Sequence, residues 1–81
     1  MITPEQCRAA RALVGMSQDQ LAADAKVGNS TVRNFEAGRS VPVTNNIDAI
    51  ERALVGRGVQ FIPENGGGAG VRLAKPTSPH R

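Results

Sequence analysis

Residues 17–38 constrain the fold of this 81-residue chain more than any other segment. Ser17 and Gln20 have the spacing of a capping box, in which two side chains satisfy the free backbone donors at a helix start. The apolar residues that follow share one stripe of a helix and are Leu21, Ala22 and Ala25. A second apolar pair, Val32 and Phe35, is spaced three residues apart. The segment therefore predicts two short helices joined by a tight turn.

The second of these helices carries polar side chains on the side opposite its apolar pair. They occupy positions i, i+1, i+4 and i+5, and we call them the polar ridge: Asn29, Ser30, Arg33 and Asn34. Asparagine suits adenine and arginine suits guanine in the major groove of DNA, so such a ridge is typical of a helix that contacts base edges. The competing interpretation is an ordinary solvated helix face.

A further helix is expected at the start of the chain. Thr3 is suited to the N-cap, Pro4 to the first helical position, and Gln6 completes a capping box. Gly15 ends this helix, because glycine readily adopts the left-handed conformation of a C-cap.

A fourth helix is expected after a loop over residues 39–43 that Pro42 stiffens. Thr44 or Asn45 caps it, and Gly56 and Gly58 stop it. Its apolar stripe consists of Ile47, Ile50, Ala53 and Leu54, which should cover the first three helices. The predicted core of the domain is Cys7, Ala10, Val14, Leu21, Ala22, Ala25, Val27, Val32, Phe35, Ile47, Ile50 and Leu54.

Beyond residue 58 the sequence changes character. Residues 59–62 are β-prone, 63–70 are rich in turn residues, and 71–73 can return as a second strand. An isolated two-stranded hairpin is marginal in water, so it must pack on the helices or pair with another chain. We expect a symmetric homodimer; the alternative is a hairpin folded back on its own fourth helix. The side chains assigned to the dimer contact are Val59, Phe61, Ile62, Val71 and Leu73.

The arrangement of the central segment resembles the lambda-repressor-like (Xre-type) helix-turn-helix family. The resemblance rests on Ser17-Gln18 with Leu21-Ala22, and on Phe35-Glu36-Ala37-Gly38 at the proper separation, and it covers roughly residues 4–56. It implies a mainly α fold with four helices. Together with the strand signals, the domain organisation is a helix-turn-helix DNA-binding domain over residues 1–58, a β-hairpin over 59–73 and a disordered tail over 74–81.

The resemblance also implies roles for individual side chains. The polar ridge takes the base contacts, and the DNA backbone contacts fall to Gln18, Thr31 and Arg39. For Gln18 the alternative is an amide that caps its helix or is solvated, and for Arg39 a plain loop arginine. Arg11 and Glu36 match family positions that often form an ion pair inside the domain, so Glu36 is interpreted as structural.

Two positions depart from the family pattern. Lys26 stands in the turn where the family usually has glycine, and a residue with a side chain at positive φ costs about 1 kcal/mol. Gly28 stands where the family has a serine or threonine cap, and glycine is still an acceptable N-cap.

The remaining features of the sequence mainly exclude other classes of protein. The single cysteine, Cys7, cannot form an internal disulfide and is expected to be a small core residue in a reduced, cytoplasmic protein; a redox sensor would need an exposed, activated thiolate. No apolar run approaches the ~18 residues that span a membrane, and the first residues lack the pattern of a signal peptide. Net charge is a mild +3.

No residue pattern indicates catalysis, a metal site or a cofactor. The glycines over residues 66–68 lack the lysine, serine or threonine and helix of a phosphate-binding loop, so a hairpin loop is expected there. His80 has no cysteine or histidine partner for a metal ion. The chain is therefore not expected to be an enzyme.

Three functions are consistent with these residues. The first is a sequence-specific regulator of transcription, a repressor of the phage or mobile-element type, that binds double-stranded DNA at a palindrome as a homodimer. The second is an antitoxin-like regulator that also binds a toxin through its C-terminal segment. The third is the same fold used to bind a protein, as in an anti-activator.

Overall fold

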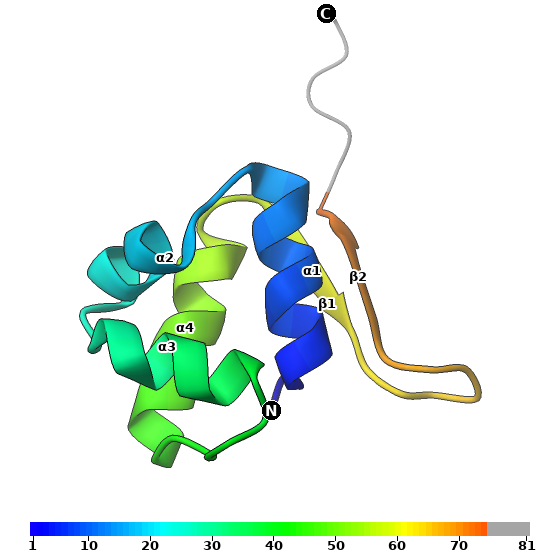
Figure 1. The fold of residues 1–81 in the computed structure, drawn as a ribbon. Helices are drawn as coiled ribbons and strands as arrows, with labels where there is room; N and C mark the ends of the chain where they lie inside the picture. The colour runs from blue at the N-terminus through cyan, green and yellow to red at the C-terminus, as the bar shows by residue number, and fades with distance from the viewer. Residues whose placement is uncertain (75–81) are drawn as a thin grey trace, which may run out of the picture.

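The computed structural model describes residues 1–74. These residues form four helices and one two-stranded antiparallel sheet (Figure 1). The helices are α1 (Pro4–Val14), α2 (Gln18–Ala25), α3 (Asn29–Glu36) and α4 (Thr44–Val55), and the strands are β1 (Val59–Ile62) and β2 (Gly70–Leu73). The predicted mainly α fold with a C-terminal hairpin is confirmed. The predicted tail lies, apart from Ala74, outside the described residues.

The first two helices begin as the capping-box spacing predicts. The Gln6 backbone N–H donates to Thr3 Oγ1 at 3.0 Å, and Gln6 Oε1 accepts from the Thr3 backbone N–H at 2.9 Å. Ser17 and Gln20 make the same reciprocal pair at the start of α2. Because each box satisfies two backbone donors that the helix leaves free, the starts of α1 and α2 are fixed locally.

The start of α4 differs from the prediction. Val43 is the N-cap residue and its side chain makes no capping bond, while Thr44 is already the first helical residue. The predicted cap at Thr44 or Asn45 is therefore wrong. Packing, rather than capping, determines where α4 lies: its fully buried residues are Ile47, Ile50 and Leu54.

The core lies between the four helices, and the hairpin covers one side of it. Every predicted core residue is buried or packs against the buried cluster; Val14 and Val27 are the two that are only partly buried. Ile2, Met16 and Val59 join this cluster and were not predicted. They come from connecting segments and from β1, where no helical spacing marks them.

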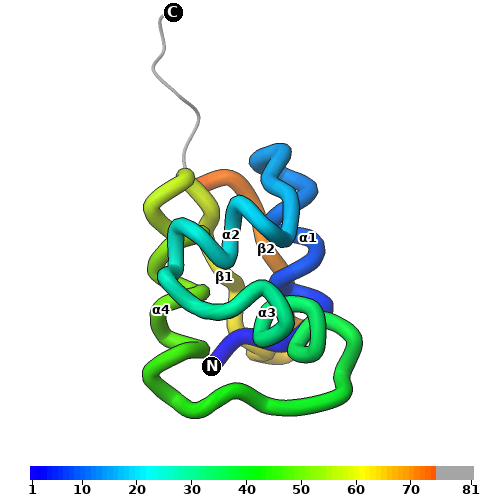
Figure 2. The backbone as a smooth tube through the Cα atoms, turned by 60° about the vertical axis from the view of Figure 1, so that its left-hand side comes forward, coloured from blue at the N-terminus to red at the C-terminus, as the bar shows by residue number. Residues whose placement is uncertain are grey.

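The hairpin packs on its own domain. Residue Val59 pairs with Leu73 and Phe61 with Val71, and the sheet lies against α1 and α4. Figures 1 and 2 show it on the side of the domain opposite α2 and α3. Gln6 is a buried residue of α1 that binds the loop end of the hairpin. Its Nε2 donates to the carbonyls of Ile62 at 3.2 Å and Gly70 at 3.0 Å.

This packing changes which hairpin residues a partner can reach. Val59, expected at a dimer contact, is 1% exposed and belongs to the domain's own core, so it is not available to a second chain. Phe61 and Val71 pack partly against the core, and Ile62 is half-buried. Leu73 remains 56% exposed at the end of β2. The hairpin thus folds back on the helices, as the alternative interpretation has it.

Candidate nucleic-acid interface

The turn between α2 and α3 sets the angle at which α3 is presented. Lys26 ends α2 in the left-handed conformation, with φ 59° and ψ 44°, and the Val27 N–H donates to the Ala22 carbonyl at 3.0 Å. Gly28 precedes α3 with extended backbone and provides no side-chain cap. Both departures from the family pattern are therefore real features of the turn, and the lysine carries backbone strain there.

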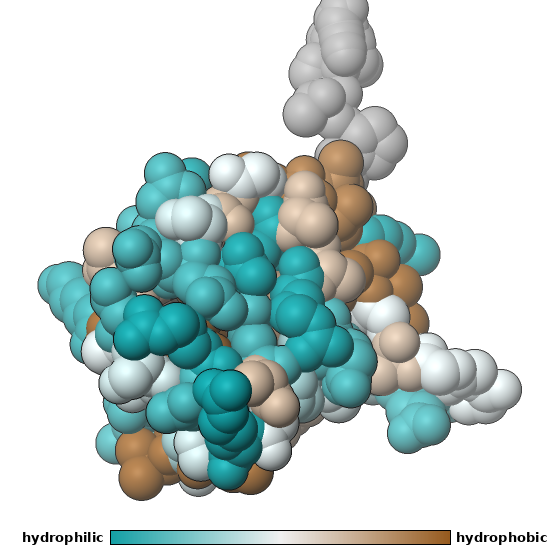
Figure 3. Space-filling model, in the orientation of Figure 1, coloured by the Kyte–Doolittle hydropathy of each residue, from teal (hydrophilic) through white to brown (hydrophobic). Residues whose placement is uncertain are grey.

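The two faces of α3 have opposite character. Val32 and Phe35 are buried, at 0% and 3% exposure, whereas Asn29, Ser30 and Arg33 are exposed and Asn34 is half-buried. Figure 3 shows a largely hydrophilic surface over α2 and α3, with hydrophobic residues beside the hairpin and at the lower edge of the domain. The apolar face fixes the helix to the core, so the polar ridge is held at the surface of the domain.

Two ridge residues already have hydrogen-bond partners on neighbouring elements. Asn29 Nδ2 donates to Asp19 Oδ1 at 2.9 Å. Arg39 Nη1 donates to Asn34 Oδ1 at a long 3.4 Å. The structure thus brings Arg39, expected at the DNA backbone, beside the ridge. Thr31, another expected backbone contact, lies half-buried in the first turn of α3.

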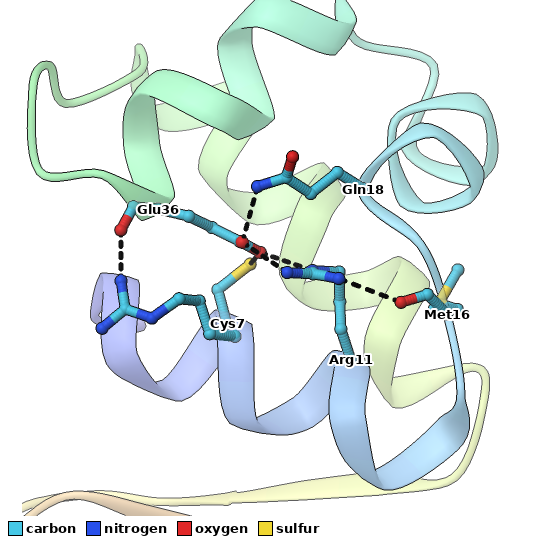
Figure 4. A network of polar contacts seen from close by, with 6 residues as sticks. Cys7, Arg11, Met16, Gln18 and Glu36 are labelled. Carbon is cyan, nitrogen blue, oxygen red and sulfur yellow. Dashed lines mark hydrogen bonds and ion pairs between the residues drawn. The ribbon is translucent and has the colours of Figure 1, made fainter.

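At the far end of α3, Glu36 is the centre of a buried polar network (Figure 4). The carboxylate is 3% exposed and accepts two hydrogen bonds from Arg11, each 2.7 Å long. It also accepts from Cys7 Sγ at 3.0 Å and from Gln18 Nε2 at 3.0 Å. Arg11 Nη1 in turn donates to the carbonyl of Met16 at 3.0 Å.

This network ties three elements together. Cys7 and Arg11 belong to α1, Gln18 is the first residue of α2, and Glu36 is the last of α3. Arg8 of α1 donates to the Glu36 backbone carbonyl as well, and so satisfies an acceptor that the helix end leaves free. The end of α3 is therefore fixed to α1 and to the start of α2 by side chains rather than by apolar contact alone.

The charges in the network are matched. Burial raises the pKa of Glu36, but the hydrogen bonds from Arg11, Cys7 and Gln18 outweigh it, so the pKa lies below its usual range. Hydrogen bonding to Glu36 raises the pKa of Arg11. Burial, followed by the hydrogen bond to the Glu36 carboxylate, raises the pKa of the Cys7 thiol. Cys7 is thus protonated at neutral pH and acts as a hydrogen-bond donor.

Several of these contacts were not predicted. Cys7 was interpreted only as a small core residue, and Gln18 only as a contact to the DNA backbone or as an amide that caps its helix or is solvated. The spacing of Cys7 and Arg11, four residues apart, places both on one face of α1 and could have indicated a shared partner. No comparable signal connects Gln18 with Glu36, because their proximity depends on how α2 and α3 pack.

A comparison with protein-family models identifies the class that this geometry defines. The model of a helix-turn-helix family matches residues 8–54, more than half of the chain. The chain belongs to the lambda-repressor-like (Xre-type) helix-turn-helix family. Among curated proteins, none matches it. The matched region ends within α4, so the hairpin lies outside it.

Residues 1–74 contain no group of three or more cysteine, histidine or acidic side chains that could hold a metal ion. Over the same residues, no helix has the length and apolar character needed to cross a bilayer.

Proposed function

We propose that this chain is a sequence-specific repressor of transcription that binds a palindromic DNA operator as a homodimer in the cytoplasm. The family it belongs to supports a DNA-binding regulator. The observation that carries the finer proposal is the exposure of Asn29, Ser30 and Arg33 on a helix whose opposite face is fully buried. Those side chains can donate and accept in the pattern that base edges offer in the major groove.

In this proposal the site residues divide into two groups. The polar ridge reads base edges, and Gln18, Thr31 and Arg39 hold the DNA backbone, which positions the protein without carrying sequence information. Gln18 Nε2 donates one hydrogen to Glu36, and an amide nitrogen has a second to offer a phosphate. Glu36 itself does not face the phosphates, because Arg11 pairs with it inside the domain.

The ridge is tested by binding to an operator selected from random DNA. Arg33→Ala and Asn34→Ala should each weaken binding by about 1–3 kcal/mol and relax the preference at one half-site position. Arg39→Ala should weaken all sequences alike. An Asn29/Arg33/Asn34 triple alanine variant that binds the operator normally would show that the ridge does not read DNA.

For the homodimer we propose strand addition along β2. A single helix-turn-helix unit contacts few base pairs, and two copies reach half-sites about 34 Å apart. β2 is an edge strand, and its last residue, Leu73, is 56% exposed, although Val59 is not available. Pairing of two β2 edges about a two-fold axis would cover backbone groups that otherwise invite aggregation.

Sedimentation of the full chain and of residues 1–57 tests this interface. The full chain should be dimeric at tens of micromolar and the shorter chain monomeric. The shorter chain also loses Val59 from the core, so Leu73→Lys in the full chain serves as the second variant and should reduce dimerisation without loss of fold. A monomeric full chain overturns the dimer and favours the alternative, in which the free β2 edge binds a toxin or an activator while α3 remains exposed on the opposite side.

A further inference from the structure

A side-chain hydrogen bond joins α2 and α3 at the exposed end of the polar ridge. Asp19 is the second residue of α2 and Asn29 is the first residue of α3. Asn29 Nδ2 donates to Asp19 Oδ1 at 2.9 Å, and both residues are exposed. The bond therefore spans the turn between the two helices and involves a side chain that the proposed function assigns to base contact.

We propose that Asp19 is a positioning residue that fixes the amide of Asn29, so that Asn29 selects a base with an exocyclic amino group, adenine or cytosine. The inference rests on the proposed function, since it specifies what one residue of the polar ridge recognises. It assigns Asp19 a role in specificity without contact with DNA.

The selection follows from the chemistry of the two side chains. An asparagine amide has an accepting oxygen and a donating nitrogen of nearly the same shape, so a free amide can present either one. An ionised carboxylate only accepts hydrogen bonds. Asp19 therefore holds the nitrogen of Asn29 towards itself, and the oxygen Oδ1 and the second N–H are left for the groove.

Base edges in the major groove distinguish these two orientations. Adenine and cytosine present amino donors at N6 and N4, which match the free Oδ1, whereas guanine and thymine present acceptors at O6 and O4. The second N–H could also donate to guanine or thymine, but neither base offers an amino donor to the free Oδ1. That oxygen would then face an acceptor or a methyl group and be left unpaired. Adenine fits best, because its N7 also accepts the second N–H.

The N-terminal end of α3 favours the position of the Asp19 carboxylate. The first turn of α3 contains no acidic residue, and Gly28 offers no side-chain cap. A carboxylate from α2 beside the first residue of α3 lies at the positive end of that helix, where negative charge is favourable. The same arrangement keeps the carboxylate next to the amide that it orients.

The experiment measures dissociation constants at one fixed salt concentration for operators that differ at one half-site position. That position is the one whose preference Asn29→Ala abolishes, and each of the four bases is placed there in turn. The proteins are the unchanged chain, Asp19→Asn, Asn29→Ala and the double variant. Asp48→Asn is the control, because it removes the same charge from an exposed position on α4.

The unchanged chain should bind operators with adenine or cytosine at this position about tenfold or more tightly than operators with guanine or thymine. Asp19→Asn keeps the shape but can donate as well as accept, so the ratio should fall to that of Asn29→Ala. Removal of a carboxylate near the phosphates should at the same time strengthen binding to all sequences. The double variant should lose no more selectivity than Asn29→Ala, and Asp48→Asn should leave the ratio unchanged.

Two results would overturn the role of Asp19: a full ratio retained in Asp19→Asn, or a preferred base that is guanine or thymine. If Asp19 were merely structural, Asp19→Asn would change the melting temperature and not the ratio of the dissociation constants for the different bases. Failure of the unchanged chain to bind any selected DNA would instead overturn the proposed function, and with it this inference.

Discussion

The two ends of α3 are held in opposite ways. Glu36, at the C-terminal end, is buried and accepts hydrogen bonds from three side chains, including both arms of the Arg11 fork. The N-terminal end follows a strained Lys26, has no side-chain cap at Gly28, and carries one exposed bond between Asn29 and Asp19. Asn29 and Ser30, the first two residues of the polar ridge, thus stand at the weakly held end.

This difference shows where the domain concentrates its polar contacts. A buried ion pair is costly to break, because removing one partner leaves an uncompensated charge away from water. Such a contact keeps the end of α3 in one position relative to α1. At the other end, exposed hydrogen bonds contribute little to stability, so the side chains there can be exchanged for others without unfolding the domain. The residues that fix α3 to the core are consequently different from those proposed to read bases.

Removal of the aromatic anchor should have the largest effect of any single change in α3. Phe35 is 3% exposed, and Phe35→Ala should lower the free energy of unfolding by about 3–5 kcal/mol. That loss approaches the whole stability of a small domain. Urea unfolding followed by circular dichroism measures it, with Val43→Ala as control because Val43 is 68% exposed. A loss of under 1 kcal/mol would contradict the burial of Phe35 in the core.

Breaking the buried end of α3 should cost nearly as much. Glu36→Ala leaves Arg11 without its carboxylate and should lower the free energy of unfolding by about 3 kcal/mol, since Arg11 is itself partly buried. The control is Glu5→Ala, because Glu5 is 76% exposed in its side chain and lies 4.0 Å from Arg8. That variant should change stability by less than about 0.5 kcal/mol. Equal losses in the two variants would mean that the network contributes no more than a surface pair.

The buried end of α3 was largely predictable and the exposed end was not. Helical spacing within α3 identified Val32 and Phe35. The ion pair of Arg11 and Glu36 joins two helices, and it was identified by the family resemblance and not by spacing. Other contacts between elements left no trace in the sequence. The bond from Gln18 to Glu36 and the bond from Asn29 to Asp19 exist only once α2 and α3 are placed side by side.

The hairpin is a second case in which the sequence predicted the elements but not the contacts between them. Its strands were predicted from β-prone residues and turn residues, and the strand bounds differ only at Gly70. The sequence pattern could not decide between packing on the domain and pairing with a partner, since apolar side chains serve both. One contact that holds the hairpin on the domain is the hydrogen bond from Gln6 to the carbonyl of Ile62. These two residues are 56 positions apart in the sequence.

Acid should weaken the network at the buried end of α3. The folded pKa of Glu36 is depressed below its unfolded value of roughly 4.3. The stability that Glu36 contributes is therefore fully present above about pH 5 and is lost as the pH falls through the folded pKa. Urea unfolding between pH 3 and 7 should show a steeper loss for the unchanged chain than for Glu36→Gln. Parallel curves for the two proteins would contradict the depressed pKa.

Relief of strain at the exposed end should have the smallest effect and the opposite sign. Lys26 has φ 59°, so Lys26→Gly should stabilise the domain by about 0.5–1 kcal/mol, the strain of a left-handed lysine less the greater freedom of glycine in the unfolded chain. For a domain of this size the melting temperature should rise by roughly 2–8 °C. Lys26→Ala is the matched control, because it removes the same charge and keeps the strained backbone, so its melting temperature should not rise. Equal stabilisation by glycine and alanine would show that the charge of Lys26, and not its backbone, weakens this end of α3.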